Sequence, residues 1–252
     1  MRARAGVPGT KRSRVEDVVL NLFFVAVCAT ILVPFVLLLV ISVTDNATLL
    51  RNGYRFVPET WSFEAYRFLF QNGRVVRDAY AVTLLVTSLG TVGHLTLAAL
   101  TAYPLTKRTL PGVTALTFFV FFVMLFNGGL VASYIINTRL LAFRNHFRAL
   151  ILPIMFNVWH VLIFRTYFKT SIPASIEESA KMDGASDLRI FAQIVLPIAK
   201  PVLGAIGLFA AVTYWNDWFH SLLYISEERM YSLQFVMLRS LRQVEVMRRL
   251  MA

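Results

Sequence analysis

The chain has 252 residues, of which 57% are hydrophobic and only 15% are charged. Because an average soluble domain carries about a quarter charged residues, this composition excludes an ordinary soluble domain and indicates helices covered by lipid or by one another. The net charge of +11 does not indicate nucleic-acid binding, since the basic residues lie at the N-terminus and between apolar runs rather than on one polar face.

The N-terminus combines a basic segment, residues 1–17, with a first apolar run, residues 18–43. This run is about twice as long as the 7–15 apolar residues of a cleaved signal peptide, and no small-residue cleavage pattern follows it. We therefore expect an uncleaved signal-anchor helix with its basic end in the cytoplasm. The single cysteine, Cys28, lies inside this run, so no internal disulfide is possible and no metal site is indicated.

Five apolar runs are long enough to cross ~30 Å of hydrocarbon as helices. The polar segment 44–78 after the first run is predicted to be an extramembrane loop with a short amphipathic helix from about Ser62, its cap, to Phe70. The runs define a predicted transmembrane domain over residues 18–224, followed by a polar tail, residues 225–252. They are approximately Val18–Val43, Tyr80–Tyr103, Val113–Ile136, Ala149–Tyr167 and Val202–Tyr224.

The loop 169–200 between the last two runs is polar and can form helices. Residues 174–182 are good helix formers with acidic residues near their start, which suits the helix macrodipole. Gly184 permits a left-handed turn, and a second short helix is predicted from Ser186 to Pro197. With the basic N-terminus in the cytoplasm, this loop also lies there.

The spacing of residues in this loop resembles the EAA loop of the inner-membrane permeases of ATP-binding cassette (ABC) importers. That pattern is Glu-Ala-Ala, three residues, Gly, nine residues and Ile-x-Leu-Pro, and this chain departs from it only in the middle alanine, which is a serine. The resemblance implies an all-α polytopic bundle of the MetI-like type. It also implies that the loop couples the permease to an ATPase through Glu178, Ser179, Ala180, Asp183, Gly184, Ala185, Ile194, Leu196 and Pro197.

Segments outside the loop are similar to the carbohydrate-uptake branch of these permeases, the MalG type, and in particular to LplC-like permeases. They are residues 126–131, 149–153 and 215–219. The resemblance implies a multi-pass subunit of the cytoplasmic membrane that moves a sugar or oligosaccharide. Its implied partners are a second homologous permease, an ABC ATPase dimer and an extracytoplasmic sugar-binding lipoprotein.

No enzymatic activity is predicted. The sequence contains no Gly-x-x-x-x-Gly-Lys-Ser/Thr loop, so ATP and Mg²⁺ are expected in the partner ATPase and no cofactor in this chain. His94 is interpreted as a hydrogen-bonding residue between helices, and His146 and His160 as isolated structural residues.

Polar and aromatic side chains within the apolar runs are candidates for the substrate path, because buried polar groups in a membrane are costly unless they are paired or functional. Helix packing or an interfacial aromatic belt is the alternative for each. The candidates are Asn127, Tyr134, Asn157, Trp215 and Asn216, with Trp159, His160 and Asp217 as further members.

Several alternatives stay open at this point. The family usually carries a sixth span, and this chain shows five, which leaves a truncated chain, a disrupted reading frame or a five-helix fold. The solute can be something other than a sugar. The chain can also be a secondary carrier or membrane anchor without an ATPase, and the loop an amphipathic segment at the membrane surface.

Overall fold

The computed structural model describes residues 14–71, 73–107, 110–126 and 128–251. Pairing of extended backbone in these ranges is limited to one isolated bridge between Thr44 and Trp61, so the predicted all-α class is confirmed. The basic residues before Arg14 lie outside the described ranges. The helices are α1 Arg14–Ser42, α2 Asn46–Asn52, α3 Glu64–Gln71, α4 Gly73–Ala102, η1 Pro104–Thr106, α5 Val113–Leu125, α6 Gly129–Ile135, η2 Ile136–Leu140, α7 Arg148–Ile151, η3 Leu152–Ile154, α8 Val158–Ser171, α9 Ala174–Met182, α10 Asp187–Ile190, η4 Phe191–Val195, α11 Leu196–Ile198, α12 Lys200–Trp215, α13 Phe219–Tyr224, η5 Glu228–Met230 and α14 Leu233–Met251.

The chain divides into two compact units, Met1–Gly73 and Arg74–Ala252. In the first unit, α1 is long and apolar enough to cross a membrane, and its window of highest hydropathy buries none of its residues inside the protein. Leu22, Phe24 and Leu39 are all more than half exposed. Lipid or another chain must therefore cover this helix, since water would not.

Local hydrogen bonds order the segment after α1. The Asp45 carboxylate accepts from the backbone N–H of Thr48 and so caps α2. The amphipathic helix predicted from Ser62 is α3, and the Ser62 hydroxyl accepts from the N–H of Glu64 at its start. The hydroxyls of Tyr66 and Ser42 lie 2.9 Å apart, which joins α3 to the end of α1.

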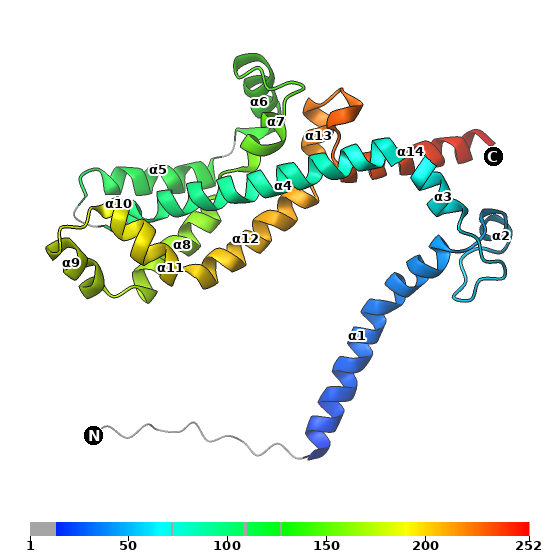
Figure 1. Ribbon diagram of the computed structural model, residues 1–252, viewed down its shortest axis with the longest axis horizontal. Coiled ribbons are helices and arrows are strands. Elements are labelled where there is room, and N and C mark those ends of the chain that lie inside the picture. The colour runs from blue at the N-terminus through cyan, green and yellow to red at the C-terminus, as the bar shows by residue number, and fades with distance from the viewer. Residues whose placement is uncertain (1–13, 72, 108–109, 127, 252) are drawn as a thin grey trace. The chain divides into compact units, whose positions relative to one another are not determined.

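In the second unit, α4 runs beside two groups of shorter helices (Figure 1). Near its C-terminal end lie α5 and α8–α11, and toward its other half lie α6, α7 and α13. Each group has its own hydrophobic cluster. The coupling-end cluster includes Ala98, Phe164, Ile190, Val195 and Ile206, and the outer cluster includes Val82, Val86, Leu150, Tyr214 and Tyr224.

A close approach between α4 and α12 depends on a glycine. A Cβ atom built on Gly90 would lie 2.5 Å from the ring of Tyr214, so only glycine fits there. The Tyr214 ring is held in place because its hydroxyl donates to the carbonyl of Ile151 at 2.9 Å. Toward the other end of α4, the Thr83 hydroxyl accepts from the N–H of Leu233 and ties the start of α14 to α4.

Two helices in the described ranges, Glu16–Ser42 and Gly73–Thr106, qualify as membrane spans by themselves, and up to five do if each bent pair counts as one. The predicted run 202–224 is interrupted: α12 ends at Trp215, and α13 starts at Phe219, because the Asp217 carboxylate accepts from the first N–H groups of α13. The prediction did not include α14, where apolar residues and arginines alternate with helical spacing.

Candidate functional site

The bend that follows α9 has the hydrogen bonds of a Schellman motif. The N–H of Ala185 donates to the carbonyl of Ala180, and the N–H of Gly184 donates to that of Lys181, both at 3.0 Å. Gly184 has φ +79°, the left-handed conformation that the motif requires after a helix. Ala180 and Ala185 both pack against the coupling-end cluster, as the apolar contact across this motif demands.

The second half of the bend starts a new helix immediately. The Ser186 hydroxyl accepts from the N–H of Arg189 and caps α10. An ion pair between Lys181 and Asp187, at 2.9 Å, spans the turn from α9 to α10. The predicted helix, glycine bend and helix are therefore present, held by bonds that are all local in sequence.

Residues of the Ile-x-Leu-Pro segment fasten the bend to the bundle. Ile194 and Leu196 pack against the coupling-end cluster, in which Val195 is fully buried. Pro197 lies in α11, the short helix that directly follows the wider, π-helical turn η4. The hydroxyl of Tyr167 in α8 donates to the carbonyl of Ile198 at 3.4 Å.

A half-buried ion pair ties α9 to the end of α4. Lys107, directly after η1, pairs with Glu177, and both side chains are less than one-fifth exposed. Its ammonium also lies 4.5 Å from the centre of the Tyr103 ring. Burial and, after it, the positive charge of Lys181 lower the pKa of Lys107, whereas the charge of Asp187 raises it. The Glu177 carboxylate is the direct partner of this ammonium group.

The opposite face of the bend is exposed. Glu178, Ser179 and Asp183 are exposed there, and beside them Met182 is 89% and Leu188 is 69% exposed. Two large apolar side chains thus stand at the tip among acidic and small residues. A protrusion of this kind, closed by hydrogen bonds and packed on the bundle, suits a groove in another protein.

The predicted substrate-path residues that the structure describes each have a contact of their own. Asn157 uses its side-chain oxygen to cap α8, and the Asn216 amide donates to the carbonyl of Val212 in its own helix. Trp215 contacts Tyr80 edge-on, and Tyr134 stacks on Tyr224. In the described part of the chain, no hydrogen bond or ring contact joins any two of the four, and Asn127 lies outside the described residues.

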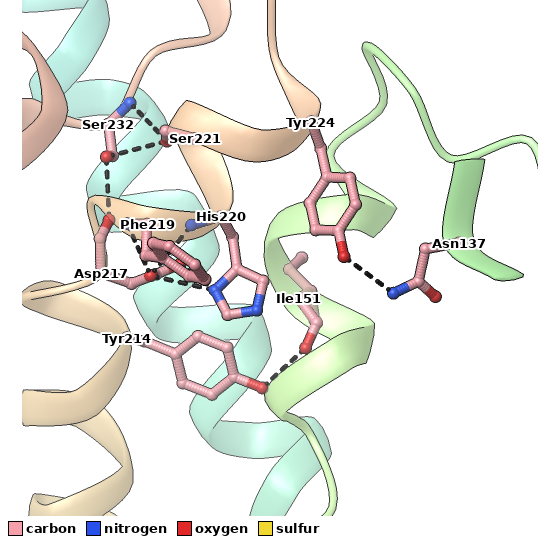
Figure 2. A network of polar contacts seen from close by, with 9 residues as sticks. All are labelled: Asn137, Ile151, Tyr214, Asp217, Phe219, His220, Ser221, Tyr224 and Ser232. Carbon is pink, nitrogen blue, oxygen red and sulfur yellow. Dashed lines mark hydrogen bonds and ion pairs between the residues drawn. The ribbon is translucent and has the colours of Figure 1, made fainter. Parts of the chain in front are cut away.

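A polar network, of which the sequence analysis named only Asp217, lies between α13 and η2 (Figure 2). The Nδ1 atom of His220 lies 3.0 Å from both carboxylate oxygens of Asp217, and the amide of Asn137 donates to the hydroxyl of Tyr224 at 3.1 Å. The three-residue spacing of Asp217 and His220 was a usable signal. No signal in the sequence indicated that Asn137 pairs with Tyr224, because the two residues are 87 positions apart.

The interpretation of His94 as a residue between helices is confirmed. Its Nδ1 atom lies 2.7 Å from the carbonyl oxygen of Met155 and its Nε2 atom 2.7 Å from Nδ1 of His160. The interpretation of His160 as isolated was therefore wrong. Among the described residues, no three His, Cys, Asp or Glu side chains come together as metal ligands.

Residues 108–233 match the family described as "Binding-protein-dependent transport system inner membrane component". The chain belongs to this family, and it is therefore a membrane transport subunit and not an enzyme. The predicted membership of the ABC-importer permeases is confirmed.

Two curated relatives come from Bacillus subtilis (strain 168). Protein LplC is 37% identical over 238 residues, which are 94% of this chain and 78% of that protein. The polygalacturonan/rhamnogalacturonan transport system permease protein YtcP is 34% identical over 91% of this chain and 79% of its own. A solved structure, of a bacterial ABC transporter involved in the import of the acidic polysaccharide alginate, has a chain that matches with a TM-score of 0.79. That chain is 30% identical, and the match covers 88% of this chain and 80% of that one.

Proposed function

We propose that this permease moves a sugar or oligosaccharide through the cytoplasmic membrane, together with a second homologous permease. An ATPase dimer would bind ATP and Mg²⁺, and an extracytoplasmic sugar-binding lipoprotein would deliver the substrate. The substrates named for YtcP and for the alginate transporter support a saccharide as the substrate class. A different solute handled by the same fold is the second candidate.

The observation that carries the coupling proposal is the bend between α9 and α10, which is closed by hydrogen bonds, packed on the coupling-end cluster and exposed on its other face. We assign contact with the ATPase to its exposed residues, Glu178, Ser179, Asp183 and, at the tip, Met182 and Leu188. The other motif residues hold the shape: Ala180, Gly184 and Ala185 form the turn, and Ile194, Leu196 and Pro197 belong to the segment that joins it to the bundle.

Displacement of the bend by the ATPase would reach α4 and α8 through fixed contacts. The pair of Lys107 and Glu177 joins α9 to the end of α4, and Nε of Arg165 in α8 donates to the carbonyl of Leu105 at 3.1 Å. Rigid-body motion of helices requires such stiff connections, since a flexible loop would absorb the movement. Along the substrate path, Tyr134, Asn157, Trp215 and Asn216 stay proposed contributors, and so does Asn127.

The coupling proposal is tested by co-purification of the tagged permease with its ATPase from membranes. We expect Met182→Ala with Leu188→Ala, or Gly184→Pro, to reduce the recovered ATPase at least fivefold, and Glu178→Ala to reduce it less. Glu64→Ala, which removes an exposed carboxylate from α3 in the other unit, is the matched control. Equal recovery with all these variants would show that the bend does not hold the ATPase.

The secondary-carrier alternative is separated by energetics. Uptake of a labelled saccharide by intact cells should stop when ATP is depleted at constant membrane potential. Uptake that persists under those conditions but is lost when the ion gradient is collapsed would overturn the importer proposal.

A further inference from the structure

A hollow of about 420 Å³ lies where α6 and η2 face α13. Its volume falls within the range of about 300–1,000 Å³ that small-molecule sites occupy. The helices α6 and α13 that line it belong to the group beside the N-terminal half of α4, whereas the coupling bend lies near the C-terminal end of α4 (Figure 1). Its lining residues are Gly129, Leu130, Ser133, Ile136, Asn137, Pro153, Phe219, His220, Leu223 and Tyr224.

The imidazole of His220 is oriented by its neighbour. Because Nδ1 lies 3.0 Å from both oxygens of the Asp217 carboxylate, its proton belongs on Nδ1. Asp217 is held in turn by the N–H groups of Phe219 and His220. Figure 2 shows Nε2 on the side of the ring away from Asp217, where it can accept a hydrogen bond.

Tyr224 contributes its hydroxyl to the hollow, whereas its ring is covered by neighbouring rings. The ring of Tyr134 stacks on it at 5.8 Å and that of His220 at 5.9 Å, and the side chain is only 2% exposed. Its hydroxyl accepts from the Asn137 amide and keeps a hydrogen to donate. The Asn137 amide oxygen and the lone pairs of the Ser133 hydroxyl, which donates to the Gly129 carbonyl, are further acceptors.

The rest of the lining is apolar, and the described lining residues include no lysine, arginine, aspartate or glutamate. Apart from His220, whose imidazole already faces the Asp217 carboxylate, the described lining offers an anionic group no basic partner, and desolvation of such a group would be costly. A sugar ring, in contrast, carries hydroxyls around its rim and C–H groups on its faces. The hydroxyls can form hydrogen bonds with Nε2 of His220, the Asn137 oxygen and the Tyr224 hydroxyl. The C–H faces can pack against the apolar lining residues, which are Leu130, Ile136, Pro153, Phe219 and Leu223.

We propose that this hollow is a subsite for one uncharged sugar ring of the transported saccharide, with His220 as its principal hydrogen-bond acceptor. The proposal rests on the proposed function and adds residues that were not among the predicted substrate-path set. It also assigns a role to the pair of Asp217 and His220, which fixes the tautomer of the imidazole.

The test uses the complete importer in proteoliposomes, with a Cys28→Ser permease that carries Ser133→Cys as a reporter in the hollow. Maltotriose, arabinotriose and galactotriose, which are all uncharged, are the probes, and glutamate is the non-sugar control. The saccharide that the importer transports should slow maleimide labelling of Ser133→Cys at least fivefold. Ala132→Cys, on the same helix but outside the lining, should label at an unchanged rate.

The second readout is transport with a saturating amount of binding protein. His220→Phe keeps a ring against Tyr224 but removes the acceptor, so we expect the apparent KM for the saccharide to rise about 5–10-fold, as for one lost hydrogen bond. His220→Gln, which restores an acceptor, should recover part of this loss. The exposed His146→Phe is the matched control and should behave as wild type.

The outcomes separate the two proposals. If the wild-type importer moves none of the three saccharides, the proposed function fails and the subsite fails with it. If it moves one but Ser133→Cys is not protected and His220→Phe is unchanged, the subsite alone is wrong. Equal protection of Ser133→Cys and Ala132→Cys would show a change of conformation instead of occupancy, and would also overturn the subsite.

Discussion

The two ends of the second unit are held together by different kinds of interaction. At the coupling bend, the defining hydrogen bonds join residues three to five positions apart, such as Ala185 with Ala180. At the outer end, hydrogen bonds join Tyr224 to Asn137, 87 positions away, and Leu233 to Thr83, 150 positions away. The bend is therefore encoded as a local motif, whereas the outer end exists only when distant helices have assembled.

This difference suits the two proposed roles. A bend whose shape is kept by local hydrogen bonds can move as a rigid body when a partner protein displaces it. A hollow between α6, η2 and α13 can change when those helices move, because its walls belong to separate segments. Variants at each end should therefore fail in different ways.

The largest effect is expected where the two halves share α4. Gly90→Ala forces a Cβ atom into the Tyr214 ring, which cannot turn aside without losing its bond to Ile151. We expect a loss of about 2–3 kcal/mol in stability, measured as a fall in the unfolding temperature of the purified complex. Gly204→Ala in α12 meets open space and is the matched control, expected to be neutral or slightly stabilising. Equal behaviour of the two variants would contradict the close packing of α4 and α12.

The next effect is expected at the tie between α9 and α4. Lys107→Ala leaves the half-buried Glu177 carboxylate without its partner, which should cost about 2 kcal/mol. Transport should fall more than the affinity for the ATPase, because the bend still docks but no longer moves α4. The exchanged pair, Lys107→Glu with Glu177→Lys, should restore part of the transport rate. No rescue, together with normal transport by Lys107→Ala, would exclude this connection.

A smaller effect is expected at the glycine of the bend. Gly184→Ala meets no neighbouring atom, so its cost comes from the left-handed backbone alone, about 1–2 kcal/mol. Gly184→Asn should cost less, because asparagine tolerates this conformation. Co-purified ATPase should decrease in the order wild type, Asn, Ala. If the order is reversed, space at the bend and not backbone conformation decides the docking.

The smallest effect is expected for the helix cap beside it. Ser186→Ala removes the acceptor for the N–H of Arg189 and should cost about 0.5–1 kcal/mol. Ser186→Asp restores an acceptor and should return the unfolding temperature to the wild-type value. A wild-type unfolding temperature for Ser186→Ala would mean that α10 is held by its packing on the coupling-end cluster and not by its cap.

Much of the coupling site was readable in advance for a physical reason. Helix propensity, the glycine bend and the serine cap act over a few residues. The local structure of residues 174–197 could therefore be predicted from these residues alone. The predicted run 202–224 was wrong at its centre because hydropathy averages over Asn216 and Asp217, whereas the backbone responds to the individual cap. The helix α14 was missed because its arginines lower the hydropathy without lowering the helix propensity.

The amino-acid sequence by itself determined the class of protein, the apolar helices and the form of the coupling bend, because composition and local motifs act without distant partners. The tertiary structure alone decided which helices touch and which polar groups meet. It placed Gly90 against Tyr214, Lys107 beside Glu177 and Asn137 beside Tyr224. Such contacts depend on packing between segments that are far apart in the chain. A single sequence does not show which distant segments lie close together in space.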